Sequence, residues 1–385
     1  MKTLKKYLYL YKTLILQIVS MLLAVLAFLI LSSKDTSFTI KLEVVLAWLG
    51  IFSMIAGFGS NSIFTQQIKT LIRRKELATL FVLRAIVSIF STFGFCIVAQ
   101  SYFSIELSIL QIISFYLFFL VDFTVIHLAF SAINAVLIIN IIRWLAILII
   151  IYFSVLKVHF IINTYIFLTI FFNLYFGRKY VRFILTPPTS FKLIKQNLLN
   201  IFKFNITNFL NITFTRLDII VAARLLPENL VLIYMFSKRL TNAMLSLSLV
   251  RSLLILGMNS QEKISNEILL INRLVILGSP FLMIALAIYW FSILGQSDLI
   301  VLTVAWLSTL LVVYLSSRKS IILNSEVHKN LKFSRDLVFT IFAFTCSIPI
   351  PFITYFFNVM LIFFFVRVIY EGCYIITVKK WQKEI

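Results

Sequence analysis

The chain alternates long apolar stretches with short polar interruptions, and the apolar stretches are continuous. Continuous runs of about 20 residues match an α-helix that crosses a hydrocarbon core of roughly 30 Å. The alternation at every second residue that a transmembrane β-barrel needs is not visible. The pattern predicts twelve transmembrane helices, at residues 14–31, 42–64, 80–99, 105–121, 132–152, 160–176, 204–226, 230–250, 269–291, 299–315, 337–354 and 357–378.

The longest polar interruption covers residues 177–203, carries six basic residues and divides the predicted helices into six and six. We expect an N-terminal six-helix bundle over residues 1–176, a basic cytoplasmic linker over 177–203 and a C-terminal six-helix bundle over 204–385. Halves with equal even numbers of spans share one topology, so a parallel pseudo-repeat is geometrically allowed. All predicted outer loops are short, and the longest covers residues 32–41.

Composition supports the membrane assignment, since 61% of the 385 residues are hydrophobic and only 13% are charged. Soluble domains average about 45–50% apolar and about 25% charged residues, which excludes an ordinary soluble fold. The formal net charge of +21 would also suit a protein that binds nucleic acid, but such a protein has no need of 40 Phe. The three cysteines fall inside predicted spans, so no disulfide framework is expected.

The basic residues are distributed unevenly over the predicted loops. If the N-terminus is cytoplasmic, 23 of the 35 Lys and Arg residues lie in inner loops, including Lys319 after the tenth span, and 4 lie at the outer face. Inner loops are enriched in Lys and Arg, so we expect both chain ends to be cytoplasmic. No small-residue cleavage site follows the first apolar run, which we therefore interpret as a span and not as a signal peptide.

The outer loops contain no pair of carboxylates, no Ser/His/Asp set and no Cys/His metal cluster, and the inner loops contain no Walker-type glycine loop. Enzymes that act at the outer face usually need a substantial external loop to build a site. We therefore expect a transporter and not an enzyme, with no cofactor and no metal.

Eight basic residues remain within the spans or at their edges. A charged side chain at the bilayer centre costs about 2.5–3.5 kcal/mol on insertion scales, so such residues are functional candidates by default. Snorkelling to the headgroups is poor from the midplane, where a cation needs a partner, a wet cavity or an anionic ligand. Five of them are candidate substrate contacts: Arg84, Arg143, Arg216, Lys238 and Arg367.

Polar residues share one face of the seventh span and one face of the eighth, at matching depth. With an acid of the twelfth span, they are predicted to line a water-filled central cavity or to take part in coupling: Asn208, Asn211, Asp218, Tyr234 and Glu371.

Two ion pairs are the structural alternative to a cavity. Asp218 and Lys238 lie at similar depth on adjacent spans, and Arg367 lies four residues before Glu371 on one helix face. Cations outnumber acids in the interior even after these pairings. A net cationic interior favours an anionic guest, such as a phosphate or pyrophosphate headgroup.

Two stretches resemble the O-antigen and polysaccharide flippases (Wzx type) of the multidrug/oligosaccharidyl-lipid/polysaccharide exporter superfamily. Residues 54–68 are similar to the second helix of that family, with a Phe-Gly and polar turn before a basic loop. Residues 215–228 and 233–240 look like its seventh and eighth helices, with an Asp, a short outer turn, and then Tyr and a basic pair.

The resemblance implies two six-helix bundles that enclose a central cationic cavity open to one face at a time. It implies an undecaprenyl-diphosphate type of lipid-linked oligosaccharide as cargo, moved from the inner to the outer leaflet of the bacterial inner membrane. It also implies association with a polymerase and a chain-length regulator. Nucleic acid is not an expected partner.

Two other functions remain open. A polysaccharide polymerase of the same pathway is also polytopic, but that family typically has large external loops. A multidrug exporter of the same superfamily would be expected to have an acidic cavity.

Overall fold

The computed structural model describes much of the chain, and all regular elements in that part are helical. Each of the twelve predicted spans overlaps a described helix. Seven described helices are long and apolar enough to cross a membrane, and three shorter apolar helices accompany them. The prediction of an all-α, multi-pass membrane protein is confirmed. The described residues are 2–57, 77–103, 107–121, 133–153, 158–184, 209–210, 213–255, 277–324, 333–357 and 360–383.

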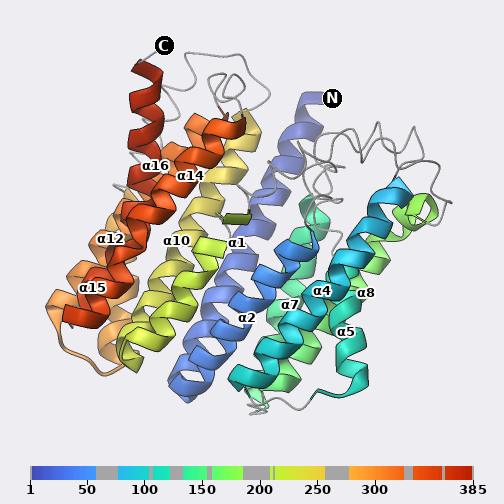
Figure 1. Cartoon of the computed structure of the whole chain (residues 1–385), viewed down its shortest axis with the longest axis horizontal. Helices are drawn as coiled ribbons and strands as arrows, with labels where there is room; N and C mark the ends of the chain where they lie inside the picture. The colour runs from blue at the N-terminus through green and yellow to red at the C-terminus, as the bar shows by residue number, and fades with distance from the viewer. Residues whose placement is uncertain are drawn as a thin grey trace. The chain divides into compact units, whose positions relative to one another are not determined.

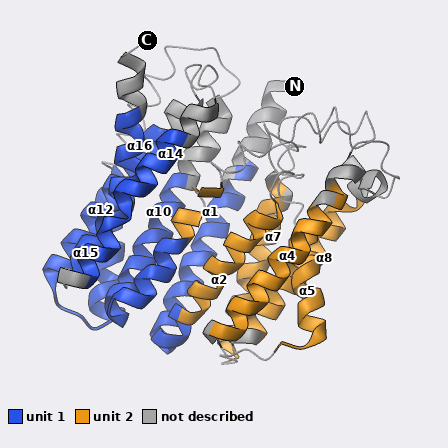
Figure 2. Cartoon of the chain, viewed as in Figure 1, with its two compact units in different colours: residues 1–40, 217–385 blue, residues 41–216 orange. Residues whose placement is uncertain are grey.

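The chain divides into two compact units (Figure 2). Unit 1 contains residues 1–40 and 217–385, and unit 2 contains residues 41–216. The predicted linker begins inside a helix, because α8 (Val158–Ile184) continues past residue 177, and residues 185–208 lie outside the described part. The division into two six-helix bundles therefore stays a prediction.

Unit 1 is a set of long helices whose neighbours are distant in sequence (Figure 1). Helix α1 packs against α10, α10 against α12, and both α12 and α14 against α16. The start of α1 and the end of α16 lie at the same end of this unit (Figure 1). Its elements are α1 (Lys2–Lys34), the first turn of α2 (Thr36–Ala56), helical residues 217–225, α10 (Glu228–Ile255), helical residues 277–287, the π-helix η1 (Ile288–Ile293), α12 (Leu299–Asn324), α14 (Phe333–Ser347), α15 (Pro349–Phe357), the 3₁₀-helix η2 (Met360–Phe365) and α16 (Val366–Lys383).

Unit 2 contains most of α2, α4 (Leu77–Phe103), α5 (Ile109–Leu120), α7 (Ile133–Tyr152), α8 and helical residues 213–216. Helix α4 packs against α5, and α5 and α7 both pack against α8. Helix α5 begins with a capping box, in which the Ser108 hydroxyl accepts from the Gln111 backbone and the Gln111 side chain accepts from the Ser108 backbone. The cap satisfies amides that a helix start would leave unpaired.

Two segments predicted as loops are helical. Helix α1 ends at Lys34 and α2 begins at Thr36, so a single residue separates them where we expected an outer loop over residues 32–41. That residue, Asp35, accepts a hydrogen bond from the Phe38 amide at 2.8 Å and caps α2. Helix α12 continues to Asn324, so Lys319 lies in a helix and not in a loop.

The helices expose apolar side chains and bury hydroxyls, as a lipid-facing protein should. Phe93 of α4 is 66% exposed, whereas Ser91 and Thr92 are buried. The Ser91 and Thr92 hydroxyls donate to carbonyls one turn back on the same helix, at 3.1 and 2.7 Å. These bonds satisfy each hydroxyl locally, so its burial needs no water.

Candidate functional site

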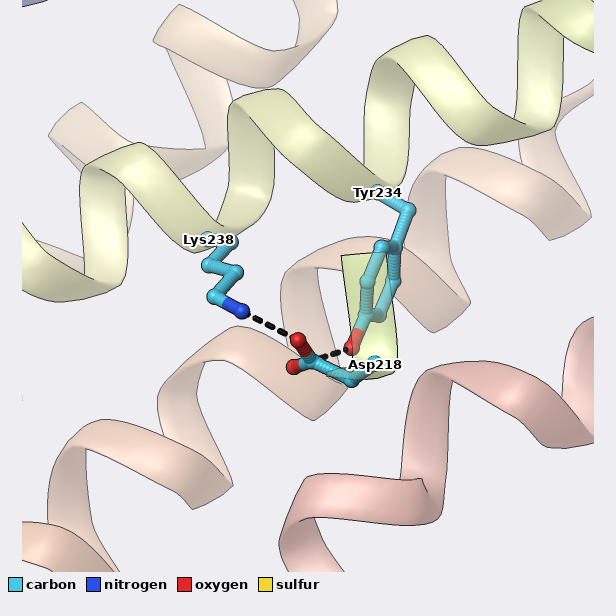
Figure 3. Close-up of polar contacts among 3 residues, drawn as sticks. All are labelled: Asp218, Tyr234 and Lys238. Carbon is cyan, nitrogen blue, oxygen red and sulfur yellow. Dashed lines mark hydrogen bonds and ion pairs between the residues drawn. The ribbon is translucent and has the colours of Figure 1, made fainter. Parts of the chain in front are cut away.

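Three side chains of unit 1 form a buried polar group (Figure 3). The Asp218 carboxylate forms an ion pair with the Lys238 ammonium and accepts a hydrogen bond of 2.9 Å from the Tyr234 hydroxyl. All three residues are buried. The Asp218–Lys238 pair that we gave as the structural alternative is formed, and both carboxylate oxygens are engaged.

The local sequence explains how these residues meet. Tyr234 and Lys238 are four residues apart on α10 and therefore share a face. Asp218 lies on helical residues 213–225, and a turn at Leu226 and Pro227 leads directly into α10. Asp218 and Lys238 lie at similar distances along the chain from this turn. Because the turn joins two antiparallel helices, the two side chains lie at the same depth, as predicted.

The other polar residues on this face of α10 are satisfied within the helix. The Ser237 and Thr241 hydroxyls are buried and donate to the Ile233 and Ser237 carbonyls, at 2.7 and 2.9 Å. These hydroxyls are therefore satisfied without a water-filled cavity beside residues 237–241 of α10. We name Asp218, Tyr234 and Lys238 the central triad.

Arg367 lies next to the central triad. It is 8% exposed and follows, by one turn, the two η2 rings that pack against Tyr234. The 3₁₀-helix η2 ends one residue before it, and the η2 rings of Phe363 and Phe364 pack edge-on against Tyr234, with centroids 5.3 and 5.5 Å away. These ring contacts hold the start of α16, and so Arg367, beside the central triad.

The expected Arg367–Glu371 ion pair is not formed. Glu371 instead pairs with Lys319 of α12, whose ammonium lies 3.2 Å from Glu371 Oε2. The same ammonium lies 4.9 and 4.4 Å from the ring centroids of Tyr370 and Tyr374. Two aromatic faces and one carboxylate stabilise a buried cation that a hydropathy profile had placed in a loop.

Sequence reasoning could not assign this partner from α12 itself. The run Ser316-Ser317-Arg318-Lys319-Ser320 has the polarity typical of the end of a span. The available signal was Glu371, since a carboxylate inside a span requires a cation from some neighbour. Which neighbour supplies it depends on the packing of α12 against α16.

The buried charges of unit 1 do not balance. Among its described buried residues, the carboxylates are Asp218 and Glu371, and the cations are Lys238, Lys319 and Arg367. Two of the cations are engaged in ion pairs with the two carboxylates. One positive charge is left over, and it is that of Arg367.

In unit 2, Arg143 is the centre of a second polar cluster. Its guanidinium donates to the Tyr165 hydroxyl at 3.0 Å and to the Thr169 hydroxyl at 3.2 Å, and it also bonds Asn140. It lies 4.8 Å from the centroid of the Tyr165 ring. Neutral groups thus hold Arg143 half-buried between α7 and α8; Asn140, Tyr165 and Thr169 were not among the predicted site residues.

The two remaining predicted cations of unit 2 differ from each other in burial. Arg84 is 1% exposed and donates from Nε and Nη2 to the Phe119 carbonyl, at 3.2 and 3.1 Å, so it caps the end of α5. Arg216 is exposed and lies over Gly50, where an added Cβ would come within 3.1 Å of the guanidinium Nε. For both residues, cargo contact stays a prediction.

Other predicted features lie outside the described residues. Asn208 and Asn211 are among them, as are residues 58–68 of the first motif. In the described part of the chain, no group of three or more His, Cys, Asp or Glu side chains could hold a metal ion.

The chain is similar in structure to a multidrug resistance MATE family transporter of the MOP superfamily, solved in an inward-facing conformation. The TM-score is 0.62 with 13% sequence identity, and the match covers 95% of this chain and 94% of the other. No family model matches the sequence, and neither does any curated protein. The similarity shows that the two chains share a fold.

Proposed function

We propose that this protein is a flippase that moves polyprenyl-diphosphate-linked oligosaccharide units, of the O-antigen type, from the inner to the outer leaflet of the bacterial inner membrane. The transporter fold supports movement of a molecule across a membrane. The resemblance of residues 215–228 and 233–240 to the flippases favours a lipid-linked saccharide. In this proposal both chain ends are cytoplasmic, and a polymerase and a chain-length regulator are partners.

The observation that carries the proposal is the surplus cation of unit 1. Among the described residues of the unit, each of the two buried carboxylates already has a cation, and Arg367 adds a further buried positive charge. An anionic cargo such as a lipid diphosphate offsets this charge in a low-dielectric setting.

A multidrug exporter is the second candidate, because the similar solved structure is a multidrug resistance transporter. Exporters of cationic drugs need an acidic binding region, whereas the described buried residues of unit 1 carry three cations and two carboxylates. The charge balance therefore favours the flippase over the exporter.

Deletion of the gene in its bacterial host tests the proposal. We expect surface polysaccharide to disappear and lipid-linked repeat units to accumulate on the inner leaflet, and we expect a plasmid copy to reverse both effects. Loss of a polymerase would instead leave single repeats at the surface. Normal polysaccharide combined with increased sensitivity to cationic drugs would refute the flippase and support the exporter.

Substitution in the central triad connects this phenotype to the site. We expect Lys238→Ala to abolish surface polysaccharide while the protein is still present in the membrane fraction. Arg224→Ala removes an exposed cation from the same unit and serves as the matched control, with normal polysaccharide expected. Full polysaccharide with a normally expressed Lys238→Ala protein would contradict a role for the triad in transport.

A further inference from the structure

Arg367 has an environment that differs from those of the other buried cations in the described part of the chain. Lys238 and Lys319 face carboxylates, and Arg84 donates to a backbone carbonyl. Arg367 forms no hydrogen bond and no ion pair with any described residue, and its Nε is enclosed without a partner. A guanidinium carries five donors, so burial without an acceptor is costly unless something else supplies one.

Neither nearby carboxylate is available to Arg367. Asp218 accepts from both Lys238 and Tyr234, and Glu371, one turn along α16, is paired with Lys319. If Glu371 turned toward Arg367, Lys319 would lose its carboxylate. The number of buried cations that face no carboxylate would then stay the same. Neither of the buried carboxylates among the described residues of unit 1 is therefore left to accept a hydrogen bond from Arg367.

We propose that Arg367 is the binding site of unit 1 for a diphosphate oxyanion, with the Tyr234 hydroxyl beside it. The planar guanidinium forms paired hydrogen bonds with two phosphate oxygens, a geometry that an ammonium does not match. The Tyr234 hydroxyl donates to Asp218 and is neutral, so it leaves the positive charge of Arg367 for the ligand. This inference rests on the proposed function for the choice of a lipid as the source of the diphosphate.

The surrounding contacts hold the start of α16, which carries Arg367, in place before the ligand arrives. Phe363 and Phe364 fix η2 against Tyr234, and Tyr234 is fixed in turn by Asp218. The Asp218–Lys238 pair is therefore a positioning device for the site, while Arg367 itself contacts the ligand. A site held in this way binds with less loss of side-chain freedom.

Binding to the purified, full-length protein in lipid nanodiscs tests the proposal. The readout is the rise in Tm on addition of polyprenyl diphosphate, polyprenol or inorganic pyrophosphate, with apparent Kd taken from the concentration dependence. We expect polyprenyl diphosphate to raise Tm and polyprenol to have little effect. Equal protection by inorganic pyrophosphate would overturn the lipid as the source, and absence of any protection would overturn the site.

The variants Arg367→Gln and Arg367→Lys identify the residue. We expect Arg367→Gln to weaken binding of polyprenyl diphosphate on the order of ten- to hundredfold, and Arg367→Lys to weaken it less, because it keeps the charge but loses the paired geometry. Arg224→Gln removes an exposed charge of unit 1 and should bind as the wild type does. Wild-type affinity in both Arg367 variants would overturn the proposal.

The stability of the empty protein separates a binding residue from a structural one. An unpaired buried cation destabilises the empty state, so Arg367→Met should raise the Tm of the empty protein and remove its response to polyprenyl diphosphate. A lower Tm of the empty protein would mean that the fold itself needs the guanidinium, and would overturn the assignment. If Arg367→Gln loses binding but polysaccharide export is normal in cells, the flippase is refuted and the site remains. If Arg367→Gln binds polyprenyl diphosphate normally but export is lost, the site is refuted and the flippase remains.

Discussion

Substitution of Asp218 should expose how strongly unit 1 depends on its central triad. Asp218→Ala removes the carboxylate that pairs with Lys238 and accepts from Tyr234 at 2.9 Å. Breaking a buried ion pair by removing one partner costs about 3–5 kcal/mol, because the other charge stays buried without compensation. The Asp218 and Lys238 side chains are 1% and 8% exposed, so water provides little relief.

Two further variants divide this cost into its parts. Asp218→Asn retains an oxygen that accepts from Tyr234 but loses the charge, so we expect a loss of stability smaller than that of Asp218→Ala. The double variant Asp218→Ala, Lys238→Met removes both charges, and replacement of a buried ion pair by apolar side chains is often neutral or stabilising. We therefore expect the double variant to recover most of the stability that the single variant loses.

Reversible unfolding in mixed detergent micelles, followed by the fluorescence of the five Trp residues, measures these free energies. The double-mutant cycle with Lys238→Met isolates the coupling between the two charges. The reasoning is refuted if Asp218→Ala unfolds with wild-type stability, or if the double variant is as unstable as Asp218→Ala alone.

Three further substitutions, two of them with a control variant, test the packing of unit 2; one of the controls, Gly372→Ala, lies in unit 1. Gly94→Ala places a Cβ 2.5 Å from the Phe52 ring of α2 and should lower the free energy of unfolding by about 1–3 kcal/mol. In the control Gly372→Ala, the nearest atom to the new Cβ is 3.9 Å away, so the variant should be neutral or more stable by up to about 1 kcal/mol. Equal effects in denaturant titrations would contradict the close approach. Arg84→Met removes two charged hydrogen bonds to the end of α5 and should cost about 1.5–3 kcal/mol, with faster amide hydrogen exchange in α5; unchanged exchange would argue against the cap. Ser108→Ala removes the N-cap of α5 and should cost about 1 kcal/mol, whereas Ser114→Ala, which loses only a bond within the helix, should change little; equal losses would contradict the capping box.

The span positions were predictable because membrane crossing depends on local properties. A run of about 20 apolar residues forms a helix in lipid whatever its neighbours are, since every backbone group must be bonded within the segment. The joint between α1 and α2 was not predictable in the same way. Ser32, Ser33 and Thr36 are residue types common in loops. In the structure, the Ser32 and Ser33 hydroxyls donate to carbonyls of their own helix, and the Thr36 hydroxyl donates to the Glu228 carboxylate.

The candidate site was predictable in part. Asp218, Tyr234 and Lys238 could be expected to meet, because a short turn joins their two helices and period-3.6 geometry gives their faces and depth. The partner of Glu371 could not be found in this way. Lys319 lies more than 50 residues earlier in the chain, on a helix whose end a hydropathy profile places before it.

The sequence alone determined that this is a helical membrane protein, where its helices lie, and which charges are carried into its interior. These properties follow from length, hydropathy and residue type, and each can be evaluated within a segment of the chain. Only the tertiary structure decided which charges neutralise each other. Ion pairing depends on which helices are neighbours, and the packing of α12 against α16 pairs Glu371 with Lys319 and not with Arg367 on its own helix.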